Sequence, residues 1–174
     1  MKRLLALVML LLSFSAQAAA PVYVEEHVPA ARMAGKGNFT WFGLNVYDAE
    51  LWVGDKGYAP EVTYVLELRY ARNLDGKKIA DASVEEMEKM AAGTAQQRTQ
   101  WGARMREIFP DVKKGTRLAG VNLPGAGASF YLDGKLLATV PDPAFAKAFF
   151  GIWLDARTTA PALRTNLLRN AAAR

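Results

Sequence analysis

Residues 39–52 read FTWFGLNVYDAELW, and this stretch decides the fold of the chain. It is rich in aromatic and β-branched residues, which fit the pleated surface of a sheet. The pattern predicts either one long strand or a tight hairpin around Gly43. A sheet built from such residues presents a large apolar face, so another part of the chain must cover it.

A candidate for that cover is an apolar helix containing residues 149–155, FFGIWLD. Together the two stretches resemble the chalcone isomerase-like family, particularly its bacterial secreted branch. In that branch a G-x-F-x-W-x-G-x-x-VYDA-x-LW strand precedes a P-x-F-x-x-AFFGIWLD helix. Segments around residues 69–87 and 110–134 extend the resemblance, which runs from about residue 22 to 168. The family contains enzymes, fatty-acid-binding proteins and members of no known activity, so the resemblance alone leaves the function open.

The order of the expected elements predicts an α+β fold: an open-faced β-sandwich, with helices packed on one face of an antiparallel sheet. The resemblance implies the same fold. Capping boxes at Ser83-x-x-Glu86 and Thr94-x-x-Gln97 predict two helix starts, and Asp133-Gly134 predicts a hairpin turn. We expect strands at 22–26, 39–53, 62–70, 118–123, 129–132 and 135–140, and helices from 83, from 94, at 143–154 and from about 159–161. Alternation in the strand at 62–70 turns one apolar row toward the core and leaves Glu67 on the other side.

The first eighteen residues have the features of a secretion signal. Lys2 and Arg3 precede an apolar run at residues 4–14, and Ala16-Gln17-Ala18 is an A-x-A cleavage site. The apolar run is shorter than the roughly 20 residues of a membrane-spanning helix, which argues against the alternative of an uncleaved anchor. We therefore expect cleavage between Ala18 and Ala19, a periplasmic or secreted protein, and a single domain at residues 19–174 without a transmembrane segment.

Composition excludes several classes of function. The chain has no cysteine, which excludes thiol catalysis and cysteine-ligated metals, and its only histidine is His27. Without Lys2 and Arg3 it carries 20 basic and 17 acidic residues, and these are interleaved along the chain. This mild charge, together with export, argues against binding of nucleic acid. We expect no metal and no cofactor.

The resemblance also bears on catalysis. Plant chalcone isomerases use an arginine to activate an enone, with threonine, tyrosine and asparagine as polar partners. Their Phe-Thr-x-x-Gly strand matches residues 39–43, which aligns their threonine with Thr40. The other polar positions fall near Val28, Ile79, Glu86 and Leu163, although Arg164 is retained. The departures argue against flavonoid cyclisation.

An amphipathic sheet covered by apolar helices can enclose an apolar cavity with a few polar groups at its mouth. The candidate ligand-binding residues are Thr40, Trp41, Tyr47 and Arg164, although Trp41 and Tyr47 could instead fill a closed core. The leading hypothesis is non-catalytic binding of a fatty acid or a similar apolar carboxylate. The alternatives are an isomerase or intramolecular lyase acting on an enone-like substrate, and a structural partner of an envelope protein. The ligand and any protein partner are not specified by the sequence.

Export generates the first testable prediction. N-terminal sequencing of the protein from the periplasmic fraction should begin at Ala19, because the A-x-A site directs cleavage after Ala18. An isolated protein that still carries Lys2 and Arg3 would contradict this expectation.

Overall fold

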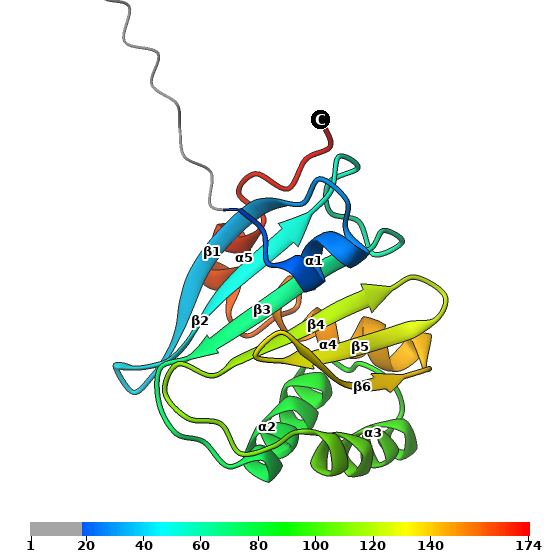
Figure 1. The fold of residues 1–174 in the computed structure, drawn as a ribbon. Coiled ribbons are helices and arrows are strands. Elements are labelled where there is room, and N and C mark those ends of the chain that lie inside the picture. Colours follow the sequence, from blue (N-terminus) through cyan, green and yellow to red (C-terminus); the bar gives the residue numbers. More distant parts are fainter. Residues whose placement is uncertain (1–18) are drawn as a thin grey trace, which may run out of the picture.

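The computed structural model describes residues 19–174, so the predicted signal peptide lies outside the described residues. A six-stranded antiparallel sheet, with its strands in sequence order, forms the body of the fold (Figure 1). Its strands are β1 (Arg32–Trp41), β2 (Leu44–Val53), β3 (Tyr64–Tyr70), β4 (Arg117–Leu123), β5 (Gly127–Leu132) and β6 (Lys135–Val140). The antiparallel α+β architecture predicted from the sequence is confirmed.

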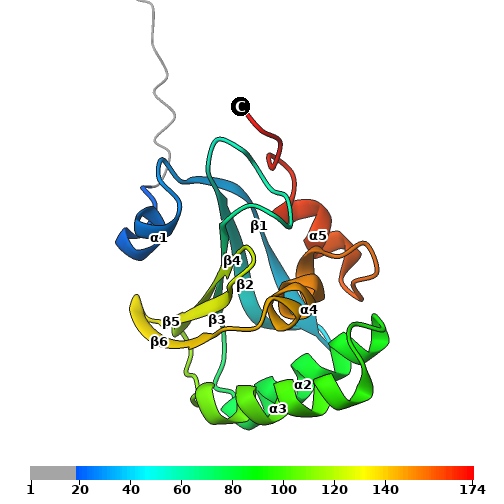
Figure 2. The same ribbon diagram turned by 90° about the vertical axis from the view of Figure 1, so that its right-hand side faces the viewer.

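The helices are α1 (Val22–His27), α2 (Gly76–Lys89), α3 (Ala95–Ile108), α4 (Pro143–Leu154) and α5 (Pro161–Leu167). Figure 2 shows α4 and α5 on one side of the sheet and the short α1 on the other. Helix α2 packs against both α3 and α4, while α5 packs against β1. None of the helices within residues 19–174 has the length and apolar character that crossing a membrane requires.

Residues 39–53 belong to a hairpin. Phe42 and Gly43 connect β1 to β2, with φ angles of 48° and 76°. Two successive positive φ angles are typical of a type I′ turn, whose twist matches that of the paired strands. The turn at Asp133 and Gly134 has φ angles of 48° and 81°, so the hairpin predicted there is also present.

The core lies between the sheet and α4, and phenylalanines dominate it. The ring of Phe130 on β5 meets the ring of Phe149 on α4 edge to face, with centroids 5.1 Å apart. Phe145 and Phe150, also on α4, are completely or almost completely buried. Helix α4 is held at its start by Asp142, whose Oδ1 accepts hydrogen bonds from the backbone N–H groups of Ala144 and Phe145.

Two local predictions were wrong: the strand at residues 22–26 and the helix start at Ser83. Residues 22–26 form helix α1 rather than a strand, and α1 buries Tyr23 and Val24 against the second face of the sheet. Glu67 is consequently buried there too, and its carboxylate accepts a hydrogen bond from the Tyr23 hydroxyl. The alternation of β3 correctly separated its two faces, but it could not show that a distant helix covers the second one.

The N-cap of helix α2 lies eight residues before Ser83, the predicted N-cap. Asp75 is the N-cap, because its Oδ1 accepts hydrogen bonds from the backbone N–H groups of Lys77 and Lys78 at 2.8 and 3.2 Å. Ser83 lies inside the helix and donates to the carbonyl oxygen of Ile79 at 2.8 Å. The capping box predicted at Thr94 is present, with both of its reciprocal bonds to Gln97.

The packing of α5 on β1 depends on glycine and generates the second prediction. A Cβ on Gly35 would collide with the carbonyl oxygens of Asn166 and Leu167, so Gly35→Ala should lower the free energy of unfolding by about 1–3 kcal/mol. Gly54→Ala is the matched control, because its Cβ would meet its nearest neighbour at 3.4 Å, an ordinary contact. Urea denaturation measures both variants, and equal stabilities would show that α5 does not pack closely on β1.

Candidate ligand-binding site

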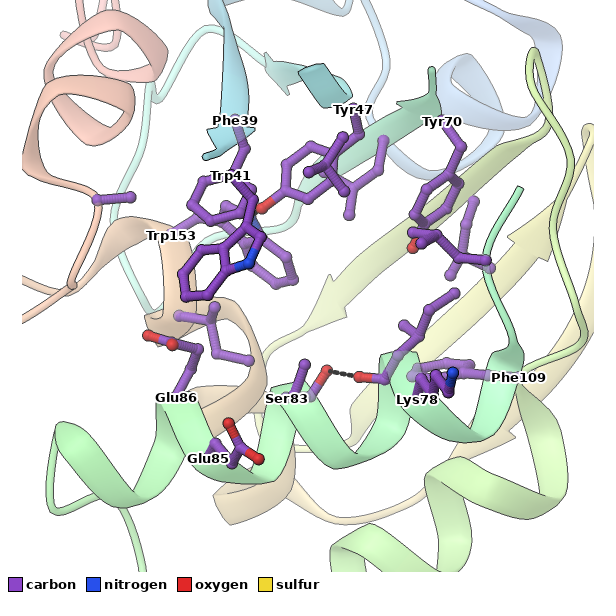
Figure 3. A pocket seen from close by; sticks show the side chains of 18 of the residues that line it. Phe39, Trp41, Tyr47, Tyr70, Lys78, Ser83, Glu85, Glu86, Phe109 and Trp153 are labelled. Carbon is purple, nitrogen blue, oxygen red and sulfur yellow. Dashed lines mark hydrogen bonds between the residues drawn. The ribbon is translucent and has the colours of Figure 1, made fainter. Parts of the chain in front are cut away.

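A cavity of about 350 Å³ lies between the sheet and helices α2 and α4. Figure 3 shows Phe39, Tyr47 and Tyr70 on the strand side, facing the α2 residues Lys78, Ser83 and Glu86. Most of the wall is apolar and includes Phe39, Val46, Leu68, Leu118, Phe149 and Ile152. The volume lies at the lower end of the roughly 300–1,000 Å³ that is typical of small-molecule sites.

Strand register builds the aromatic wall of this cavity. Phe39 on β1 pairs with Tyr47 on β2, which pairs in turn with Tyr70 on β3. The rings of Phe39 and Tyr47 are stacked with centroids 5.3 Å apart, and the rings of Tyr47 and Tyr70 meet edge to face at 6.0 Å. Directly opposed side chains on neighbouring strands come close enough for such contacts, so three strands present one continuous row of rings.

The two tyrosine hydroxyls supply polar groups within this apolar wall. Tyr47 Oη accepts a hydrogen bond of 2.9 Å from Trp153 Nε1 on α4, which leaves its own proton available for donation. Tyr70 Oη has no hydrogen-bond partner among residues 19–174, although Tyr70 is only 3% exposed. Burial raises the pKa of both hydroxyls above the usual range, so both remain protonated at neutral pH. A ligand oxygen in the cavity could therefore accept a hydrogen bond from either residue.

The exposed residues of the lining form the mouth, and several of them are charged. Lys89 Nζ lies 2.7 Å from Glu86 Oε1, and the Thr159 hydroxyl donates to the same carboxylate. Arg72 and Lys78 also line the cavity, but neither forms an ion pair with any residue in the described part of the chain. These two cations are therefore free to meet an anionic group at the mouth.

Comparison with known proteins agrees with this architecture. The family described as chalcone isomerase-like matches residues 32–169 of the sequence. The chain belongs to the chalcone isomerase-like family. Its fold is similar to the crystal structure of a fatty-acid binding protein from Arabidopsis thaliana, with a TM-score of 0.65 and 10% sequence identity, covering 82% of this chain and 89% of that one. At this identity the similarity shows the fold alone. A search of curated protein sequences found no match.

Only two of the four candidate residues line the cavity of this chalcone isomerase-like protein. Trp41 and Tyr47 do so, and Trp41 is 58% exposed at the mouth. Thr40 is exposed and absent from the lining, because successive side chains of a strand point to opposite faces. Arg164 is also absent from the lining, and its Nε donates to the carbonyl oxygen of Leu154 at the end of α4. Such a bond completes the helix terminus.

Sequence reasoning missed Tyr70, Arg72 and Lys78 as site residues. Alternation did place Tyr70 on the core side of its strand, but only the pairing with β2 puts its ring beside Tyr47. Arg72 and Lys78 flank the passage from β3 into α2, where the sequence alone offers no sign of a cavity. Two cations in a connecting segment point to a binding site only when the elements that face them in space are known.

The bond between Tyr47 and Trp153 generates the third prediction. Tyr47→Phe should lower the free energy of unfolding by about 1–3 kcal/mol, because it leaves the buried indole N–H of Trp153 without an acceptor. Tyr70→Phe is the matched control, since it removes a buried hydroxyl that has no partner in the described chain, and its effect should stay within about 0.5 kcal/mol. Denaturant unfolding followed by fluorescence measures the free energy of unfolding of both variants. An equal decrease in the two would show that the bond between Tyr47 and Trp153 does not stabilise the fold.

Proposed function

We propose that this protein is exported to the periplasm or the medium, where it binds a fatty acid or similar apolar carboxylate without acting on it chemically. The observation that carries the proposal is the composition of the cavity. Its wall is largely apolar, two protonated tyrosine hydroxyls project from that wall, and Arg72 and Lys78 stand at the mouth without acidic partners. An acyl chain matches the wall and a carboxylate matches the polar groups.

The energetics favour a ligand that has both an acyl chain and a carboxylate. Transferring an acyl chain from water to the wall contributes about 25 cal/mol for each Å² of apolar surface removed from solvent. A carboxylate gains charge-assisted hydrogen bonds, which are shorter and stronger than neutral ones. The contribution of Arg72 and Lys78 is moderated because both side chains are exposed and screened by solvent. Apolar burial therefore supplies most of the affinity, and the charges orient the ligand.

The similarity to a plant protein named as a fatty-acid binding protein supports the proposal, since the two share a fold. An isomerase or intramolecular lyase remains the second candidate and is less well supported. Thr40 is the polar residue that matches the plant chalcone isomerases in register, and it lies outside the cavity. A reaction in this cavity would therefore have to use other groups.

A fatty-acid series in thermal-shift and calorimetric experiments tests the function and forms the fourth prediction. In lipid-stripped protein, a ligand at a hundredfold excess over its dissociation constant should raise the free energy of unfolding by about 2.7 kcal/mol. Affinity should rise with chain length until the cavity is filled. A flat response to every chain length would show that the aromatic wall is core packing and that the binding proposal is wrong.

Charge variants test the orientation of the ligand. Replacing Arg72 and Lys78 with alanine together should weaken binding of the carboxylate about tenfold, and should weaken binding of the corresponding alcohol much less. Lys147→Ala is the control, because this exposed lysine on α4 is not part of the lining. Equal losses for acid and alcohol would place the carboxylate elsewhere.

A further inference from the structure

The hairpin between β1 and β2 exposes an unusual concentration of apolar side chains at its tip. Trp41 is 58% exposed, Phe42 is 89% exposed and Leu44 is 53% exposed. The rings of Trp41 and Phe42 meet edge to face, with centroids 5.1 Å apart. In Figure 1 the turn between β1 and β2 projects beyond the neighbouring strands. We call these three residues the apolar tip.

Phe42 is unfavourable at its position for two separate reasons. Its φ of 48° lies in the left-handed region, where a bulky side chain is an outlier and where asparagine, aspartate or glycine is favoured. Its ring is also almost entirely in water. The hairpin between β5 and β6 shows the alternative, because Asp133 occupies the same place before a glycine with the same φ of 48°. Folding therefore does not require phenylalanine at this turn.

The apolar tip is continuous with the mouth of the cavity. Trp41 belongs to both, since it lines the cavity and lies beside Phe42. Figure 3 shows Trp41 on the strand side of the cavity, with Glu86 of α2 facing it. One end of the cavity opening therefore lies beside the tip.

We propose that the apolar tip inserts into the surface of a lipid bilayer and brings the mouth of the cavity against the membrane, so that the ligand passes directly between the two. This inference rests on the proposed function, because it concerns the source of the same apolar carboxylate. Tryptophan and other amphipathic rings prefer the headgroup region of a bilayer, where one part of the side chain is apolar and another is hydrated.

The size of the tip favours a bilayer over a protein partner. An aromatic side chain buries at most about 250 Å². Two such rings and a leucine fall short of the roughly 800 Å² that each partner contributes to a stable protein interface. A bilayer has no such threshold, because each inserted side chain adds its own transfer free energy.

The charges at the mouth suit an anionic surface. Arg72, Lys78 and Lys89 line it together with Glu85 and Glu86, which leaves one net positive charge. Among these five lining residues, Glu86 and Lys89 pair with each other, whereas Arg72, Lys78 and Glu85 have no ionic partner in the described part of the chain. Anionic lipid should therefore strengthen membrane binding modestly, and insertion of the apolar side chains should contribute most of the binding free energy.

Vesicle flotation with a turn-preserving variant tests the inference and forms the fifth prediction. Phe42→Asp copies the residue of the β5–β6 turn, so it should keep the hairpin while removing the exposed ring. We expect it to lower partition into vesicles of phosphatidylcholine and phosphatidylglycerol in equal parts by about tenfold to a hundredfold, the change expected for burial of one phenylalanine side chain. Leu136→Asp is the control, because Leu136 on β6 is 61% exposed but outside the cavity lining, and partition should not change.

Fatty-acid affinity in the absence of vesicles separates this inference from the proposed function. Phe42 does not line the cavity, so Phe42→Asp should bind a fatty acid in solution as the unaltered protein does, which also shows that the variant is folded. Failure of the unaltered protein to bind any fatty acid overturns the proposed function. If it binds fatty acid but not vesicles, or if Phe42→Asp partitions equally, the membrane inference is wrong. A dimer that Phe42→Asp converts to monomers, without vesicle binding, would assign the tip to a second copy of the chain.

Discussion

The burial of α4 is the constraint on which the rest of the structure depends. Eight of the twelve residues of this helix are buried, including Phe145, Phe149 and Trp153. A helix with so little polar surface cannot lie on one face of a sheet with its opposite side in water. Helices α2 and α5 therefore pack around it, and β4 and β5 lie beneath it. The positions of α2 and α5 follow from this requirement.

The cavity is the place where this covering is incomplete. Around β5 the rings of α4 fill the space, and Phe130 contacts Phe109, Phe145 and Phe149. Nearer the tip of the β1–β2 hairpin, the sheet and α2 separate, and the space between them is lined but not filled. Protein interiors are normally close-packed, so an apolar space of about 350 Å³ that opens at the surface is the feature on which the ligand-binding proposal rests.

The opposite face of the sheet is closed by a different device. Helix α1 covers Trp52 and Val65, and beneath it the buried carboxylate of Glu67 accepts a hydrogen bond from Tyr23. Arg117 Nη1 lies 3.7 Å from Glu67 Oε1. A buried carboxylate is tolerated only with such partners, so this contact specifies where α1 sits. The two faces thus differ: one is sealed by a specific polar contact, and the other retains an apolar opening.

Local chemistry in the sequence was sufficient for much of the fold. Gly134 predicted one tight hairpin, Thr94 predicted a helix start, and alternation in β3 predicted its core face, because each effect acts over a few neighbouring residues. At Gly43 the sequence allowed either a hairpin or one long strand, and the structure has the hairpin. Only the tertiary structure decided which helix covers Glu67, and that Arg72 and Lys78 rather than Arg164 stand at the mouth of the cavity. The cavity is bounded by residues from β1, β2, β3, α2 and α4, which lie far apart in the chain. A sequence pattern shows which way a side chain points, but whether the facing element fills the space in front of it depends on the packing of the whole domain.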